Sequence, residues 1–160
     1  MEKSAVVFFS VKGNTRFVAE IITDEMNADS FEIKIFKKRR PFYNYLKFLI
    51  ACIFGLKPKI RKIEFHPEKY EKIFIGSPVY WRTFSPVIRS FKKKYPLKNK
   101  KVHLFCTYQF SGDRAVRKMK IFFKQNNVLS SRKWKEPIEN DEIEQALLIK
   151  NWIMENKKIN

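Results

Sequence analysis

The stretch "SVKGNT", residues 10–15, holds residue types that together can bind a phosphate group. It follows the apolar run 4–9 and precedes residues with helical spacing, so it is predicted to form a turn between a strand and a helix. The amides that open a helix lack intrahelical partners and carry partial positive charge, which stabilises an anion there. Two hydroxyls, a glycine and a lysine add donors, close backbone approach and a full charge. The candidate phosphate ligands are Ser10, Lys12, Gly13, Asn14 and Thr15.

The spacing of this loop narrows the kind of phosphate ligand. The sequence has neither GxxxxGK[ST], the nucleoside-triphosphate pattern, nor GxGxxG, the dinucleotide pattern, so a monophosphate fits it better. The structural alternative is that Asn14 or Thr15 only caps the following helix, since these residue types are common caps and "GN" is an ordinary turn. The loop by itself leaves both interpretations open.

A second loop, within "GSPVYWRTFSP" at 76–86, carries adjacent aromatic residues. Pro78 stiffens the turn, and Tyr80 and Trp81 stand just beyond a predicted strand, where large rings are unfavourably exposed unless they cover something. A flat aromatic ligand would explain both rings. The alternative is that one ring packs into the core and the other covers a neighbouring helix.

A third loop, "TYQFSGD" at 107–113, again combines hydroxyls and aromatic rings with Gly112 and Asp113. Its structural alternative is that Asp113 only caps the next helix. A phosphate at the first loop and aromatic walls at the second and third describe one phosphorylated planar ligand. One shared ligand is a simpler explanation than a separate role for each of the three loops.

The segments around these loops alternate between strand and helix patterns. Continuous or alternating apolar runs predict strands at 4–9, 31–36, 72–76, 100–107 and 128–134. Apolar residues spaced by three and four predict helices from Asn14, over 42–56, from Pro86, over 114–126 and over 141–158.

This alternation predicts one α/β domain over residues 1–160, because the sequence has no repeat, low-complexity segment or long linker. Its sheet should be mainly parallel and doubly wound, with helices on both faces. In such sheets ligands bind outside the carboxyl ends of the strands, where the strand order reverses. The loops at 10–15, 77–84 and 107–113 are expected at that edge.

These loops resemble those of the flavodoxin family. "SVKGNT" is similar to the FMN-phosphate loop, Ser/Thr-x-Thr-Gly-Asn-Thr, and "IFIGSPVYW" resembles the strand and loop whose aromatic residue covers the flavin ring. "KKVHLFCTYQFSGD" resembles the strand and loop on the other side of the ring. The matches extend in order over nearly the whole chain. The resemblance implies a short-chain, flavodoxin-like five-stranded parallel sheet of order 2-1-3-4-5 that binds FMN noncovalently and passes electrons.

The resemblance also implies the site residues. The phosphate of FMN would be held by Ser10, Lys12, Gly13, Asn14 and Thr15. One wall of the ring site would be formed by Pro78, Val79, Tyr80 and Trp81, with Thr107, Tyr108, Gly112 and Asp113 near the other. Lys12 departs from the family pattern, because a charged, longer side chain stands where a threonine is usual.

The strong basic charge is a second departure, since flavodoxins are typically acidic. The chain has 34 Lys and Arg against 16 Asp and Glu, a net charge of +18, which favours anionic partners such as acidic redox proteins. The alternative is that clusters of basic residues such as 37–40 are ordinary solvated faces that keep a protein soluble. The sequence has no helix-turn-helix, zinc-finger or RNP-type pattern, so specific nucleic-acid binding is not expected.

The predicted helix over 42–56 has a wide apolar face between basic ends, which suits peripheral contact with an anionic membrane; burial in the fold is the preferred alternative. The longest apolar run, 48–56, is shorter than the about 20 residues of a spanning helix. The N-terminus does not resemble a secretory signal. Cys52 and Cys106 lack metal-site or disulfide-framework spacing, so we expect a cytoplasmic protein without a metal.

Catalytic patterns are sparse, and a noncatalytic electron carrier is therefore the main functional prediction. Neither His66 nor His103 has a Ser or Cys at motif spacing, and Cys106 is expected to be a buried small hydrophobe. Any enzymatic activity would be that of an FMN-dependent oxidoreductase, because the flavin carries the chemistry. The alternatives are an NAD(P)H:quinone-type reductase and a flavodoxin-like binding module without FMN.

Overall fold

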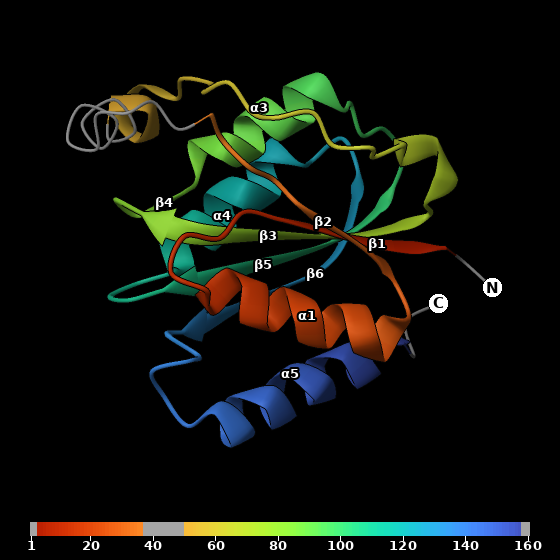
Figure 1. Ribbon diagram of the computed structural model, residues 1–160, viewed down its shortest axis with the longest axis vertical. Helices are drawn as coiled ribbons and strands as arrows, with labels where there is room; N and C mark the ends of the chain where they lie inside the picture. The colour runs from red at the N-terminus through yellow and green to blue at the C-terminus, as the bar shows by residue number, and fades with distance from the viewer. Residues whose placement is uncertain (1–2, 37–49, 158–160) are drawn as a thin grey trace.

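The computed structural model describes residues 3–36 and 50–157 of the chain (Figure 1). The strands are β1 (Ser4–Phe8), β2 (Asp29–Glu32), β3 (Lys72–Tyr80), β4 (Thr83–Phe84), β5 (Lys101–Tyr108) and β6 (Asn127–Lys135). The helices are α1 (Asn14–Met26), α3 (Pro86–Lys94), α4 (Asp113–Phe122) and α5 (Glu142–Lys157), with a 3-10 turn at Pro67–Lys69. Strands and helices thus alternate along the chain, as the sequence predicts.

The sheet has the predicted topology. The parallel strands lie in the order β2-β1-β3-β5-β6, and the short β4 pairs antiparallel with β3. Because β5 and β6 are the fourth and fifth parallel strands along the chain, this is the order 2-1-3-4-5. α1 and α5 cover one face of the sheet, and α3 and α4 cover the other (Figure 1). The flavodoxin-like, doubly wound α/β class is confirmed.

β1 is buried on both faces, as its continuous apolar run predicts. Ala5 and Val7 belong to the core that contains α3 and α4, whereas Val6 and Phe8 belong to the core that contains α1 and α5. Successive side chains of a strand point to opposite faces of the sheet. Both sets are buried because helices cover both faces.

β2 begins and ends earlier than the predicted strand 31–36. It spans Asp29–Glu32 because β1, its parallel partner, ends at Phe8. The following residues leave the sheet, and Ile35 forms an isolated antiparallel bridge with Ile60. The alternating pattern continues beyond the strand, so it does not mark where the pairing stops.

The predicted strand 72–76 and the predicted loop 77–84 are wrong in their boundaries. β3 continues to Tyr80, turns at Trp81 and Arg82, and returns as β4. The second loop is therefore a short β-hairpin rather than an irregular connection.

Two residues that usually interrupt strands lie within β3 for packing reasons. A Cβ at Gly76 would collide with the ring of Phe105, so this glycine lets β5 pack closely. Pro78 lies beyond the end of β1, where that side of β3 is an edge, and proline is tolerated there. On the other side, β3 still pairs with β5 at Pro78↔Thr107.

The later elements lie at their predicted positions, with small shifts at their ends. α4 ends at Phe122 rather than at 126, because the amide of Phe123 closes the last turn on Met119 and Lys120. The ring of Phe123 is fully buried, which fixes this end of the helix against the sheet.

Much of the predicted helix over 42–56 lies outside the described residues. Residues 50–54 are helical, with Ala51 and Cys52 buried and Ile53 and Phe54 exposed. Its membrane and burial interpretations both stay predictions. Within the described part of the chain, no helix is both long enough and apolar enough to cross a membrane.

Candidate functional site

The three candidate loops meet at one edge of the sheet because they follow neighbouring strands. β1, β3 and β5 are adjacent and parallel, so their carboxyl ends lie side by side. The strand order reverses at β1, with β2 on one side and β3 on the other. Ligands of open α/β sheets bind at such a position.

Gly13 opens α1 in a conformation that suits close approach of an anion. Its φ of 104° is in the left-handed region, and a Cβ there would lie 3.1 Å from Ile138 Cδ1. Gly13 has no side chain to cap the helix, the Ser10 hydroxyl takes only the Arg16 amide, and the first turn of α1 contains no acidic residue. The opening amides therefore keep the partial positive charge that stabilises an anion.

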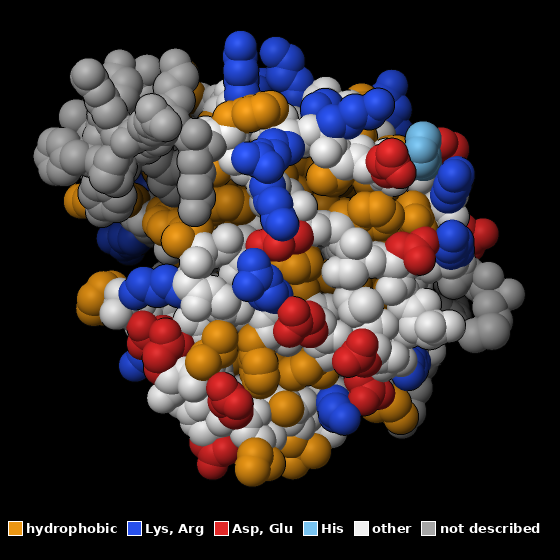
Figure 2. Space-filling model, viewed as in Figure 1, with side chains coloured by type: hydrophobic (Ala, Val, Ile, Leu, Met, Phe, Trp, Pro, Cys, Tyr) orange, Lys and Arg blue, Asp and Glu red, His pale blue; other side chains and the backbone are white. Residues whose placement is uncertain are grey.

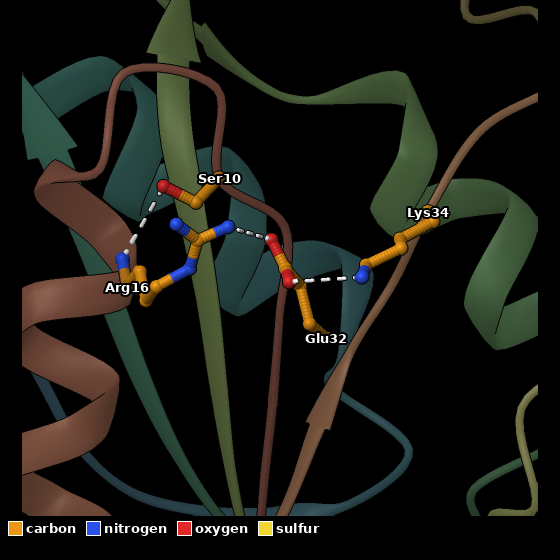
Figure 3. A network of polar contacts seen from close by, with 4 residues as sticks. All are labelled: Ser10, Arg16, Glu32 and Lys34. Atoms are coloured by element: carbon orange, nitrogen blue, oxygen red, sulfur yellow. Dashed lines mark hydrogen bonds and ion pairs between the residues drawn. The ribbon is translucent and has the colours of Figure 1, made fainter. Parts of the chain in front are cut away.

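Ser10 and Arg16 tie the first loop to the end of β2 (Figure 3). The Ser10 hydroxyl accepts a hydrogen bond from the Arg16 amide at 3.3 Å, which leaves its own O–H as a donor. The Arg16 guanidinium donates to Glu32 at 2.6 Å, and Lys34 Nζ lies 3.7 Å from the other carboxylate oxygen. The hydrogen bond to Glu32 raises the pKa of Arg16. Arg16 is thus occupied at β2, whereas Lys12 is exposed on the loop.

The side chain of Asn14 has a structural role. Its Oδ1 accepts a hydrogen bond from the amide of Ile138 at 3.0 Å, and its Nδ2 donates to Glu139 at 3.2 Å. Asn14 therefore fastens the turn after β6 to the start of α1. Asn14 can contribute to a phosphate through its backbone amide and through the second N–H of Nδ2. No local pattern marks Ile138 and Glu139 as partners of Asn14, because they lie far along the chain.

Thr15 and Thr107 connect the first loop with the third. Their hydroxyl oxygens lie 2.7 Å apart, and either can be the donor. Both residues are buried, with exposed fractions of 1% and 3%. Two residues that the sequence assigned to different ends of the ligand are therefore in direct contact.

The β3–β4 hairpin presents Trp81 at its tip. Val79 and Tyr80 are half-buried and pack against the core, whereas Trp81 is 66% exposed. Trp81 and Arg82 have φ values of 48° and 58°, so both turn residues are left-handed. Left-handed backbone is unfavourable for side chains of this size. The hairpin thus holds an indole in a strained, projecting position.

Thr83 is a site candidate that the sequence analysis does not select. It pairs with Tyr80 across the hairpin and is 3% exposed. Its hydroxyl has no hydrogen-bond partner among the described residues. A buried, unpaired hydroxyl costs about 1–3 kcal/mol, which an acceptor on a ligand would remove. A threonine within a short strand carries no distinguishing pattern, so the sequence could not reveal it.

The third loop carries an ion pair and an exposed ring. Asp113, the first residue of α4, pairs with Lys133 on β6, and this hydrogen bond lowers the pKa of Asp113. Lys133 Nζ also lies 5.5 Å from the centre of the Tyr108 ring. Gly112 is buried against this ring, and Phe110, which the sequence analysis passes over, is 90% exposed. Asp113 therefore fixes the loop to the neighbouring strand.

Cys106 is a buried hydrophobe, as predicted. Its thiol lies 3.7 Å from the Met119 sulfur, and burial raises its pKa to about 12. A thiol with this pKa stays neutral and unreactive near pH 7. Among the described residues, no group of His, Cys, Asp and Glu side chains is arranged to hold a metal ion.

The fold is shared with solved structures at low sequence identity. A candidate flavoprotein from Bacteroides uniformis has a TM-score of 0.81 and 19% identity, covering 96% of this chain and 98% of that chain. One from Bacteroides eggerthii has a TM-score of 0.77 and 20% identity, covering 96% of both chains. A flavoprotein from Lactobacillus acidophilus, solved in complex with FMN, has a TM-score of 0.69 and 22% identity, covering 89% of this chain and 98% of that chain.

Sequence comparison gives the family. The search among curated proteins finds no match. The sequence model of the flavodoxin family matches residues 55–156, which is more than half of the chain and begins after the candidate phosphate loop. This chain therefore belongs to the flavodoxin family.

Proposed function

We propose that this protein binds FMN noncovalently and carries electrons between redox proteins of the cytoplasm. The observation that carries the proposal is the convergence of three loops at the reversal point of the sheet, where Thr15 and Thr107 join the first loop to the third. Membership of the flavodoxin family supports a flavin ligand. The FMN complex of the Lactobacillus acidophilus flavoprotein, which has the same fold, supports FMN in particular.

The first loop fits the phosphate of FMN. Its donors would be the opening amides of α1, the free O–H of Ser10 and the ammonium of Lys12. Gly13 leaves the space that a Cβ would fill. Because Lys12 is exposed, its attraction for a dianion should weaken as salt is added.

The hairpin fits the flavin ring. Trp81 offers a large, exposed aromatic surface, and covering it with a planar ligand would remove apolar area from water. The hydroxyl of Thr83 in the hairpin is unpaired but buried, so a ligand would reach it only if neighbouring side chains moved aside. On the third loop, Tyr108 is held in place by Gly112 and Lys133.

When bound, FMN supplies the one- and two-electron chemistry. The protein binds and orients it, with its phosphate at α1 and its ring at the exposed loops. The Cys106 thiol and the buried His103 have no role in this chemistry. Cys106 is a neutral thiol, and His103 lies near the amino end of β5, away from the loops. This arrangement suits an electron carrier more than an acid–base enzyme.

Titration of flavin-free protein with FMN and with riboflavin tests the proposal. We expect FMN to bind with a change in flavin absorbance, and riboflavin, which lacks the phosphate, to bind at least about tenfold more weakly. If FMN causes no spectral change, the protein is a flavodoxin-like module without FMN. If NAD(P)H alone bleaches the bound flavin, the protein is a reductase rather than a carrier.

A further inference from the structure

Four cations stand on three elements that pack against one another beside the candidate site, and we call them the cationic cluster: Arg82, Arg89, Arg114 and Lys118. Arg82 is the second turn residue of the β3–β4 hairpin, and Arg89 belongs to α3. Arg114 lies in the first turn of α4, and Lys118 lies one turn later on the same helix. The hairpin packs on α4, with the rings of Phe84 and Phe122 5.2 Å apart.

Arg89 is held in a fixed position by aromatic rings. Its guanidinium carbon lies 4.5 Å from the centre of the Phe84 ring and 5.4 Å from that of Phe122. Its Nε is buried and has no hydrogen-bond partner among the described residues. Burial lowers the pKa of Arg89, but a guanidinium stays charged at neutral pH. Arg89 is thus an immobilised cation whose donors are not fully used.

The cationic cluster lacks ion pairs with carboxylates of the described residues. Burial lowers the pKa of Lys118, and the charges of Arg114, Arg89 and Arg82 lower it further. Like charges held this closely repel one another, and a bound anion would relieve the repulsion.

The cationic cluster adjoins the loops proposed to hold the flavin. Arg82 directly follows Trp81, and Arg114 directly follows Asp113. The exposed ring of Trp81 belongs to the hairpin, as Arg82 does. The exposed ring of Phe110 belongs to the third loop, which leads into Arg114. Arginine and exposed aromatic residues are enriched in protein–protein interfaces and often supply most of the binding energy.

The spread of the cationic cluster suits a protein more than a nucleotide. A cavity of about 410 Å³ in the described part of the chain is lined by Phe36, by residues of α3 and by the segment 57–60, and by no member of the cationic cluster. Cations spread over three elements match an extended acidic surface. The net charge of +18 would also draw an acidic protein toward the molecule.

Acidic and basic side chains are partly separated on the face shown in Figure 2. In the view of Figure 2, Lys and Arg side chains line the rim where α3 lies, and most Asp and Glu side chains gather among hydrophobic ones over α1 and α5. The neighbouring Asp113, which precedes Arg114, is paired with Lys133 and forms no ion pair with the cationic cluster.

We propose that the cationic cluster is the docking site for an acidic redox protein, whose carboxylates it binds at the rim of the flavin site. The redox role rests on the proposed function, whereas binding of the acidic surface does not. Docking there would bring the partner close to the loops proposed to hold the flavin. A flavodoxin-like carrier with an acidic surface would instead require a basic partner.

The test uses decaglutamate as a probe of an acidic protein surface, and NADPH as a probe of a nucleotide site. Binding to the 15N-labelled protein, with and without FMN, is followed by calorimetry and by amide shifts. We expect decaglutamate to shift amides in the hairpin and in the first turns of α4. We expect its affinity to fall about tenfold in Arg82→Glu/Arg114→Glu and to weaken with added salt.

The matched control is Lys98→Glu/Lys124→Glu, which changes the net charge equally. Both lysines are exposed and lie toward the amino ends of the strands, beyond α3 and α4. We expect this control to lower the decaglutamate affinity by no more than about twofold. The acid introduced at Arg114 lies at a helix N-terminus, where it is favourable, so the fold should persist. The neutral pair Arg82→Gln/Arg114→Gln replaces the first variant if its melting temperature falls.

Three results would overturn the proposal. Equal loss in the two charge-reversal variants would mean that only net charge matters. Amide shifts confined to other elements would move the site elsewhere. NADPH binding at the cluster more tightly than decaglutamate would make it a nucleotide site. Because decaglutamate binding is also measured without FMN, failure of the docking site and failure of FMN binding are separate outcomes.

Discussion

The hydroxyl oxygens of Thr15 and Thr107 lie 2.7 Å apart, although 92 residues separate them in the sequence. Thr15 stands in the first turn of α1, and Thr107 stands near the carboxyl end of β5. Both are buried, so the hydrogen bond is protected from water. This contact fixes the candidate phosphate loop relative to the third loop.

Replacing Thr107 by valine should weaken both the fold and FMN binding. Valine keeps the shape of the side chain but leaves the Thr15 hydroxyl buried without a partner, at a cost of about 1–3 kcal/mol. Urea unfolding and FMN titration measure the two effects. Thr107→Ser keeps a hydroxyl and should retain most of the FMN affinity. If the valine and serine variants bind FMN equally, the hydrogen bond does not position the loop.

Gly13→Ala should lower FMN affinity more than its effect on stability explains. A side chain at φ 104° is strained, and its Cβ would lie 3.1 Å from Ile138 Cδ1 beside the proposed phosphate. Gly55→Ala is the control, because Gly55 has φ 67°, has open space around it and belongs to none of the three loops. Each variant should lose about 1 kcal/mol of unfolding free energy. A similar loss of FMN affinity in both would contradict a specific role for Gly13.

The turn at Trp81 and Arg82 should lower the unfolding free energy of the protein while it supports FMN binding. Two-residue hairpins with both turn residues left-handed prefer Asn-Gly. Trp81→Asn/Arg82→Gly should therefore raise the unfolding free energy by about 1 kcal/mol, whereas FMN affinity should fall with the loss of the indole. Arg82→Gly alone relieves part of the strain and keeps the indole, so it should retain FMN. A less stable double variant would show that the native turn is not strained.

Stability should fall in acid because of His103. Its ring is buried against Phe74, its Nδ1 lies 2.7 Å from the Ser130 hydroxyl, and burial, aided by the charge of Lys72, lowers its pKa from 6.5 to about 4. The unfolded chain therefore binds the proton first as pH decreases. The contribution of neutral His103, at most about 3 kcal/mol, is full above pH 6.5 and is lost as pH falls toward 4.

Urea unfolding of the wild type and of His103→Phe between pH 7 and pH 4 measures this contribution. The phenylalanine variant keeps an aromatic ring but cannot take up a proton, so its stability should depend less on pH in this range. Identical pH profiles for His103→Phe and the wild type would contradict the role of the buried ring.

The local part of the site was predictable from the sequence. The continuous apolar run of β1 and the change to helical spacing at Asn14 placed the first loop, and α1 does begin at Asn14. The hairpin was not predictable in the same way. Gly76 and Pro78 are strong local terminators, but pairing of β3 with β5 and the early end of β1 allow the strand to continue through them.

By itself, the sequence determined the alternation of strands and helices, the order of the loops and the excess of positive charge, because these depend on residue type and short-range periodicity. Only the tertiary structure decided which polar groups are free. It occupies the Asn14 side chain with residues 138 and 139, pairs Thr15 with Thr107, and gathers Arg82 and Arg89 with cations of α4. These contacts join residues that are distant in the chain, and a local pattern carries no information about which distant partners folding will bring within hydrogen-bond or Coulomb range.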